Sequence, residues 1–265
     1  MITVDDICRV LENFAPLSYQ ETYDNAGLIL GSRNVELTGV MVCLDVTEAV
    51  IDEAIELGDN MIVSHHPLIF KGIKSITGKN YIENCLVKAI KNDIAIYAGH
   101  TNVDSVQEGV NGKMAEKLGL LNCRILVPGT SESFDGKEYG LGMIGNLPAG
   151  ESEMNFLHKV KTTFHCQRLR HSELTGKTIQ RVAVCGGSGS EFIEQAKAAG
   201  ADVFLTGEAR YHEFFTKGQN ILMIDAGHYE TEQFTKEVFF DLISKNFPTF
   251  AVRISRAEKN PVYYL

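Results

Sequence analysis

An internal repeat constrains the fold of this chain more than any other feature of its sequence. Similar residues recur at a constant offset of 142, without a gap. The pairs are Val42-Cys43 and Val184-Cys185, Ala54 and Ala196, Gly58 and Gly200, and Ser64 and Thr206. Further along, Ala98-Gly99-His100 matches Ala226-Gly227-His228 at an offset of 128. We therefore expect two similar units that pack about a pseudo-twofold axis.

Each copy alternates short apolar runs with segments of helical periodicity. The first copy has strand-like runs over 39–45, 60–64 and 94–99, with helices over 47–58 and 81–92. The second has strand-like runs over 178–185, 201–207 and 220–225, with helices near 151–164, over 190–200 and at roughly 230–245, and a last strand near 248–253. This alternation predicts an α/β fold in which mixed sheets are flanked by helices.

The repeat also suggests where the units begin and end. We expect a first α/β unit over 1–123, a connecting segment over 124–178, and a second α/β unit over 179–265 that includes the C-terminal helix and strand. The connecting segment is rich in glycine and holds Pro128 and Pro148, which predicts turns around one or two short strands.

Composition excludes several classes of protein. The formal net charge is −9, which argues against binding to nucleic-acid phosphates or to an anionic membrane surface. No run of about 18 apolar residues exists, so a membrane-spanning helix is not expected. The N-terminal segment has no basic region followed by a cleavage site, and the six cysteines include no C-x-x-C pair. We predict a cytoplasmic protein with reduced cysteines.

Polar clusters follow the predicted strands at their carboxyl ends, where α/β sheets collect ligands. The clusters are His65-His66-Pro67, His100 to Asp104, Glu208 with Tyr211 and His212, and His228 to Glu232. Each of these histidines, taken singly, is more often a structural residue. A repeated AGH-x-x-x-acid motif together with an HHP motif at an equivalent position argues instead for a metal site in a cleft between the two units.

Neighbouring histidines in extended backbone point in different directions, so His65 and His66 suit two ions better than one. A carboxylate of Asp104 or Glu232 could bridge ions about 3.5–4 Å apart, as in two-metal hydrolytic sites. At the 142 offset, His65 and His66 correspond to Gly207 and Glu208, which predicts a lopsided site. His100 would then act as a base or hold the ligands in place, and Glu208 would approach the cleft without binding metal.

Three other motifs have a structural and a functional interpretation. Gly186 to Ser190 could hold a phosphate on backbone N–H groups, but a tight turn with Ser190 as helix cap fits its residues better. The segment from Tyr23 to Gly27 predicts a turn, in which Asp24 could be an acidic residue that lies near the cleft without binding metal directly. Glu208, Tyr211 and His212 fit a capped helix start about as well as a catalytic group.

The motifs together resemble the NIF-three-like family of dinuclear metal-binding proteins, the GTP cyclohydrolase 1 type 2 homologs. The resemblance rests on DNAGLILG (24–31), SHHPLIF (64–70), HTNVD (100–104), GGSGSEFI (186–193), TGEARYH (206–212) and AGHYETE (226–232). It implies metal ligation by His65, His66, Asp104, His228 and Glu232, and assembly into a toroidal homohexamer. Tyr23 stands where the family commonly has Trp, and Glu208 where Asp is common.

These observations predict a metal-dependent hydrolase that acts on a nucleotide or a phosphorylated small molecule, an anionic substrate, with His100 and Glu208 as candidate catalytic residues. Two divalent ions are expected per chain, and the ligand types suit Zn, Fe, Mn, Co or Ni. The alternative is a ring-shaped protein that binds or handles metal without catalysis. A nucleotide-binding module without metal explains less, because it leaves the histidines without a role.

Overall fold

The computed structural model describes residues 1–129, 136, 138–216, 218 and 220–265, which form two compact units. The first unit comprises Met1–Val103 and Thr235–Pro261. The second comprises Asp104–Phe234 and Val262–Leu265. These boundaries differ from the ones the sequence suggests, because the C-terminal helix and strand join the first unit rather than the second.

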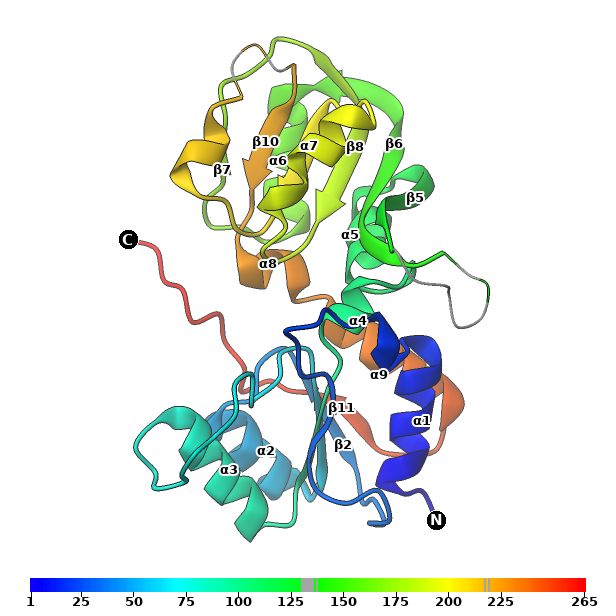
Figure 1. Cartoon of the computed structure of the whole chain (residues 1–265), viewed down its shortest axis with the longest axis vertical. Helices are drawn as coiled ribbons and strands as arrows, with labels where there is room; N and C mark the ends of the chain where they lie inside the picture. Colours follow the sequence, from blue (N-terminus) through cyan, green and yellow to red (C-terminus); the bar gives the residue numbers. More distant parts are fainter. Residues whose placement is uncertain (130–135, 137, 217, 219) are drawn as a thin grey trace. The chain divides into compact units, whose positions relative to one another are not determined.

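The first unit contains a five-stranded sheet with the order β1-β4-β3-β2-β11 (Figure 1). Its elements are α1 (Val4–Phe14), η1 (Leu17–Tyr19), β1 (Gly27–Leu30), β2 (Val40–Cys43), α2 (Glu48–Leu57), β3 (Met61–Ser64), α3 (Tyr81–Lys91), β4 (Ala95–Ala98), α9 (Thr235–Asn246) and β11 (Val252–Ile254). β11, β2, β3 and β4 are parallel, and β1 is antiparallel to β4. Helices α2 and α3 pack together, as do α1 and α9.

The second unit contains a six-stranded sheet with the order β5-β6-β8-β9-β10-β7. The short helix α4 (Thr101–Asp104) leads into it from the first unit. Its further elements are α5 (Val110–Leu118), β5 (Leu121–Pro128), β6 (Gly140–Ser152), α6 (Glu153–Thr163), β7 (Arg170–His171), β8 (Thr178–Cys185), η2 (Ser190–Phe192), α7 (Ile193–Ala198), β9 (Val203–Thr206), η3 (Tyr211–Phe214), β10 (Leu222–Asp225) and α8 (His228–Glu232). The neighbours β8, β9 and β10 pair in parallel, whereas β5 with β6, β6 with β8 and β10 with β7 pair antiparallel. The predicted α/β class with two mixed sheets flanked by helices is therefore confirmed.

Local sequence signals set the helix ends as expected. Thr3 caps α1 through a reciprocal capping box with Asp6. Thr47 caps α2, and Gly58 ends it in the left-handed conformation. The predicted C-terminal helix is instead two helices, α8 and α9, which belong to different units.

The repeat is visible in the pairing of the strands. Cys43 lies opposite Ser64 in the first sheet, and Cys185 lies opposite Thr206 in the second, which keeps the offset of 142 in both strands. In the third strand, the offset between equivalent paired residues differs by one from the offset between the two AGH motifs of the sequence. Ala98 pairs with Ser64 and Asp225 with Thr206, an offset of 127 rather than 128. As a result His100 precedes its helix, whereas His228 is the first residue of its own.

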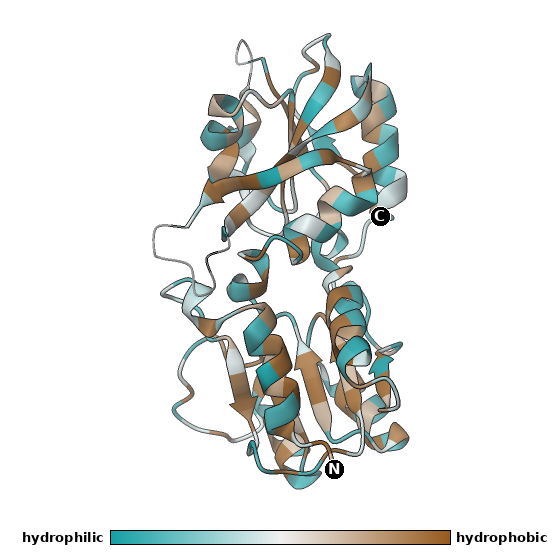
Figure 2. Cartoon of the chain, turned by 90° about the vertical axis from the view of Figure 1, so that its right-hand side faces the viewer, coloured by the Kyte–Doolittle hydropathy of each residue, from teal (hydrophilic) through white to brown (hydrophobic). Residues whose placement is uncertain are grey.

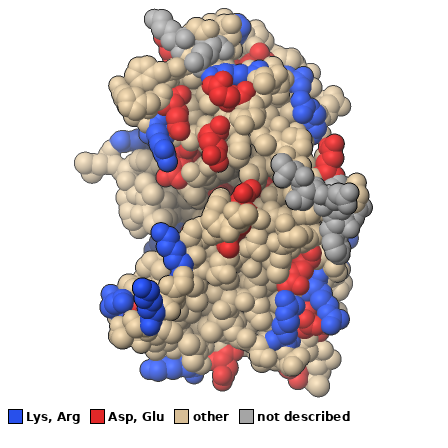
Figure 3. Space-filling model, viewed as in Figure 1, with Lys and Arg blue, Asp and Glu red and all other residues tan. Residues whose placement is uncertain are grey.

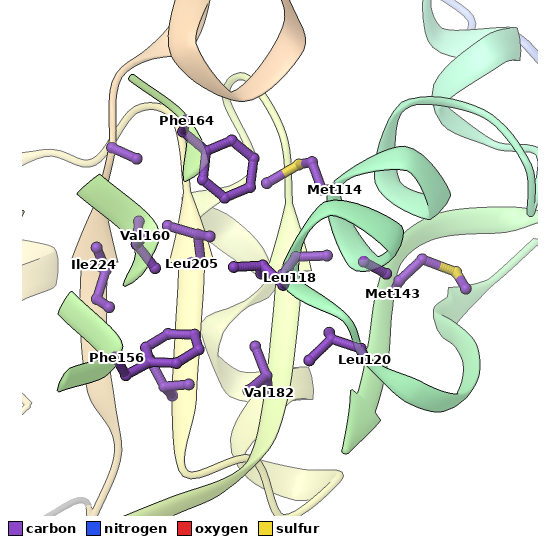
Figure 4. Packing of buried hydrophobic residues seen from close by; sticks show 14 of the residues in the cluster. Met114, Leu118, Leu120, Met143, Phe156, Val160, Phe164, Val182, Leu205 and Ile224 are labelled. Atoms are coloured by element: carbon purple, nitrogen blue, oxygen red, sulfur yellow. The ribbon is translucent and has the colours of Figure 1, made fainter. Parts of the chain in front are cut away.

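The segment predicted to connect the units is part of the second one. Within 124–178, the long strand β6 pairs with both β5 and β8, and α6 covers the sheet. Figure 4 shows Phe156 and Val160 of α6, and Phe164 just after the end of that helix, packed with Met114 and Leu118 of α5 against the strands. The apolar residues of this segment therefore help to build the core, and its glycines permit the irregular backbone of β6.

Hydropathy follows burial in both units. Figure 2 shows strongly apolar strands inside each unit and helices that alternate apolar and polar stripes. β2, β3, β4, β9 and β10 are buried along their whole length. All six cysteines are unpaired thiols, and five of them are buried. Among the described residues, no helix is long and apolar enough to cross a membrane.

Candidate metal centre

His65 and His66 are positioned by backbone that continues the first sheet. They follow β3 directly, and their N–H groups donate to the carbonyl oxygens of Cys43 (3.3 Å) and Leu44 (3.0 Å). The hydroxyl of Ser64 donates to the carbonyl oxygen of His66 at 2.8 Å. The pair therefore sits on an ordered extension of the ladder, and the His65 side chain is fully buried.

His65, His66 and His100 come together in the first unit. Their ring centroids are 4.9, 5.2 and 5.5 Å apart. One ligand nitrogen from each ring lies within 4.8 Å of the others, a grouping that could hold a metal ion. The Phe70 ring packs against His100 with centroids 6.0 Å apart and forms an apolar neighbour of the group.

Each of the three rings is held through Nδ1 by an oxygen acceptor. The acceptors are the carbonyl oxygen of Gly99 for His65, a carboxylate oxygen of Asp45 for His66 and one of Asp24 for His100, at 2.8, 2.8 and 2.7 Å. A carbonyl or an ionised carboxylate can only accept, so Nδ1 carries the proton and Nε2 carries the lone pair. Metal-binding histidines are characteristically oriented in this way, and the donor chemistry fits a divalent cation.

Asp24 is an acid beside the histidines, as the sequence suggested. Its carboxylate accepts the His100 Nδ1–H, the Thr101 N–H at 3.0 Å and the Thr101 hydroxyl. Burial raises the pKa of Asp24, but the hydrogen bonds from His100 and Thr101 outweigh it and lower the pKa to about 2. Asn102 accepts the His100 N–H at 3.0 Å. These contacts fix the backbone and the ring of His100 together.

Sequence reasoning missed Asp45 and the residue that holds it. The N–H groups of Leu44 and Asp45 both donate to one carboxylate oxygen of Glu258, at 2.6 and 2.7 Å. Glu258 is buried and forms an ion pair with Lys236 at 2.5 Å. Glu258 therefore shapes the turn that presents Asp45 to His66. The acidic residue at the end of β2 was visible in the sequence, but the contact over more than two hundred residues carried no sequence signal.

In the second unit, α8 brings His228 and Glu232 together. Nε2 of His228 lies 3.0 Å from a carboxylate oxygen of Glu232, as the H-x-x-x-E spacing predicts. Glu232 is buried, whereas 41% of the His228 side chain is exposed. Burial raises the pKa of the Cys185 thiol, and the charges of Asp104 and Glu232 raise it further, so both carboxylates act on the same buried region.

Glu208 lies beside His228, and Tyr211 and His212 belong to the 3-10 helix that follows Glu208 in the chain. Oε2 of Glu208 is 3.4 Å from Nδ1 of His228, and 62% of the Glu208 side chain is exposed. Tyr211 and His212 begin the 3-10 helix η3, whose first turn is capped by Glu213. Their rings pack on each other with centroids 5.2 Å apart. The capped-helix interpretation therefore describes the backbone of this motif.

In the glycine loop 186–190, three backbone N–H groups are engaged by side chains of the same unit and are not open to a phosphate. Gly186 donates to Asn111, Gly187 to Thr231 and Gly189 to Thr206. A Cβ at Gly187 would lie 2.0 Å from a carboxylate oxygen of Glu232. The close approach of Glu232 explains the glycine at 187, a reason that the sequence did not reveal.

Known proteins resemble this chain along nearly its whole length. The family model DUF34/NIF3 (NGG1p interacting factor 3) matches residues 2–261. The chain belongs to the DUF34/NIF3 family. Among its relatives, the GTP cyclohydrolase 1 type 2 homolog of Clostridium acetobutylicum is 38% identical over 232 residues, 87% of this chain and 85% of the relative. That of Lactococcus lactis is 33% identical over 271 residues, 98% of each chain.

Solved structures of DUF34/NIF3 proteins share the fold. A Bacillus cereus protein related to NIF3 superimposes with a TM-score of 0.90 and 25% identity, over 100% of this chain and 99% of that one. A Staphylococcus aureus protein also gives a TM-score of 0.90, with 30% identity and coverage of 99% of each chain. The similarity spans both units, so the resemblance that the motifs suggested is confirmed.

Proposed function

We propose that this DUF34/NIF3 protein is a metal-dependent hydrolase whose substrate is a nucleotide or another phosphorylated small molecule. The observation that carries the proposal is the group of three histidines whose Nδ1 atoms are all held by oxygen acceptors. Three neighbouring histidines with a purely structural role would rarely each have Nδ1 held by an oxygen acceptor. The names of the relatives, GTP cyclohydrolase 1 type 2 homologs, support a nucleotide as the substrate.

We assign two divalent ions per chain to His65, His66, Asp104, His228 and Glu232. The first two residues offer Nε2 lone pairs, and the three others offer an imidazole and two carboxylates. Bound divalent ions supply Lewis acidity and lower the pKa of a water molecule toward about 7. Two ions of charge +2 exceed the −2 of the two carboxylates, so the centre favours an anionic substrate within an acidic protein.

His100 serves in this proposal as the base that accepts a proton. Its Nδ1–H donates to Asp24, which fixes the ring and leaves the lone pair on Nε2 to accept a proton. A histidine held by a carboxylate in this way is oriented for proton transfer. Glu208 contacts His228 and orients that ring without serving as a ligand.

The decisive experiment combines metal analysis with turnover. Purified protein is expected to hold close to two transition-metal ions per chain and to hydrolyse at least one compound from a panel of nucleotides and phosphoesters. A chelator should abolish that turnover, and restored metal should return it. Two bound ions without turnover of any panel member would favour the alternative, a protein that binds or handles metal without catalysis.

The quaternary structure and location are proposed on the family resemblance. We propose a homohexamer, whose mass would be about six times the chain mass of 29.3 kDa. Light scattering that gives the mass of a single chain over a wide concentration range would contradict this. The acidic and basic side chains are interspersed on the face shown in Figure 3. This mixture of charges supports the proposal that nucleic acid is not a partner. The cytoplasmic location stays a prediction.

A further inference from the structure

The second unit contains a cavity of about 500 Å³ whose wall is largely aromatic. Its lining residues are Leu169, Arg170, His171, Tyr211, Phe214 and Phe215. Tyr211 is 72% exposed and Phe215 63% exposed, a high value for large rings in one cluster. Their centroids are 5.5 Å apart, and the His212 ring stacks on Phe215 with an interplanar angle of 26°. The rings are thus held in place by one another while their outer faces stay open.

Arg170 joins this cavity to the backbone beside the metal-ligand candidates. Its Nη2 donates to the carbonyl oxygen of Ala209 at 2.8 Å and to the buried carboxylate of Asp225. The same carboxylate accepts the N–H of Ala209 at 2.9 Å and that of Gly227 at 3.0 Å. Gly227 immediately precedes His228. A molecule in the cavity would therefore lie against a hydrogen-bonded network that also fixes the start of α8.

We propose that this cavity binds the flat heterocyclic base of the substrate. The inference rests on the proposed function and narrows its substrate class to nucleotides. Aromatic side chains recognise bases by stacking, and the volume suits a ligand of nucleoside size. A single guanidinium provides donors for a ring oxygen or nitrogen, whereas a phosphate group would call for several cations. The hydrogen bonds of Arg170 to Ala209 and Asp225 both use Nη2, so the other nitrogens of the guanidinium can donate to the base.

Guanosine is the probe that isolates this cavity, because it carries the base without any phosphate. We expect isothermal titration to detect guanosine binding to metal-depleted protein. Tyr211→Ala should weaken that binding on the order of 10- to 100-fold, since it removes a stacking ring. Tyr81→Ala is the matched control, because Tyr81 is 61% exposed but lies on α3 of the first unit. Its affinity for guanosine should equal that of the wild type, and metal content should be unchanged in both variants.

The outcomes separate this inference from the proposed function. Guanosine binding that depends on Tyr211, in a protein without turnover of any nucleotide, would support the base cavity and count against the hydrolase. Absence of guanosine binding to the wild type, or equal binding by Tyr211→Ala, would overturn the base cavity and leave the hydrolase proposal standing. The inference is also overturned if no nucleoside binds and Phe215→Ala lowers the mass in light scattering, because the rings would then join copies of the chain.

Discussion

The two units present their histidines in different ways. In the first, three rings are each fixed by a hydrogen bond of 2.7–2.8 Å, and His65 is fully buried. In the second, His228 is 41% exposed. Its Nε2 lies 3.0 Å from the buried Glu232, and its Nδ1 lies 3.4 Å from Glu208, which is itself largely exposed. The same α/β plan thus carries a preorganised group in one copy and an adaptable one in the other. We infer that the first unit sets metal affinity and that the second adjusts to the substrate.

The largest effect should come from removing a ligand in each unit at once. The combined variant His65→Ala and Glu232→Ala is expected to lose most of its metal, because neither unit then keeps its full set of donors. Elemental analysis of the purified protein, with circular dichroism to verify folding, measures this. Glu232→Ala alone should lower the content by less. A combined variant that retained two ions per chain would contradict the ligand assignment.

A large effect on rate, but not on metal content, is expected for His100. His100→Gln should keep the metal nearly intact and reduce the hydrolytic rate about 10²- to 10⁴-fold, as the loss of a general base does. The measurement is turnover per bound metal ion with the best substrate from the panel. His158→Gln offers a control outside the candidate site. Metal loss equal to that of His65→Ala would instead make His100 a third ligand of the preorganised group.

Removing a carboxylate that holds a histidine ring should lower metal affinity more in the first unit than in the second. Asp45→Ala removes the 2.8 Å acceptor of His66 and is expected to lower metal affinity about 10- to 100-fold. Glu208→Ala removes only the 3.4 Å contact with His228 and should change affinity less than threefold. Competition with a chromophoric chelator gives both values. Equal losses in the two variants would remove the distinction between a preorganised and an adaptable unit.

The sequence predicted the parts of this molecule that depend on local pattern. The 142 offset between the copies is kept in the sheets, where Cys43 pairs with Ser64 and Cys185 with Thr206, because strand register follows the apolar pattern. It did not anticipate that β11 would pair with β2, since no periodicity links residues so far apart. The sequence also did not reveal the change of offset in the third strand. The AGH motif repeats at an offset of 128, whereas the strand pairing repeats at 127.

The candidate site shows the same division. The histidines and acids at strand ends were visible as motifs, and His228 and Glu232 were related by helical spacing. The roles of Asp45 and Glu258 depend on a hydrogen bond from the C-terminal segment to the end of β2. Such a contact is set by tertiary packing, which leaves no signal in spacing or composition. A single sequence therefore indicated the candidate ligands better than the residues that orient them.

The smallest expected effect concerns the loop that packs on Glu232, and two glycines offer a matched pair. Gly187 and Gly200 both have positive φ, +58° and +74°. Alanine at either position should cost about 1–2 kcal/mol of unfolding free energy, because a Cβ is strained in that conformation. At Gly200 nothing lies within 4 Å of the added Cβ, whereas at Gly187 the Glu232 carboxylate lies at 2.0 Å.

The end of a glutamate side chain can move aside at little cost, so the two variants should differ by less than about 1 kcal/mol in urea denaturation of metal-free protein. They should differ clearly in metal binding, since only Gly187→Ala displaces Glu232 from its position against the loop. We expect Gly200→Ala to retain wild-type metal content and Gly187→Ala to lose part of it. If both retain their metal, Glu232 reaches the ions from more than one position, and the adaptability inferred for the second unit extends to its buried ligand.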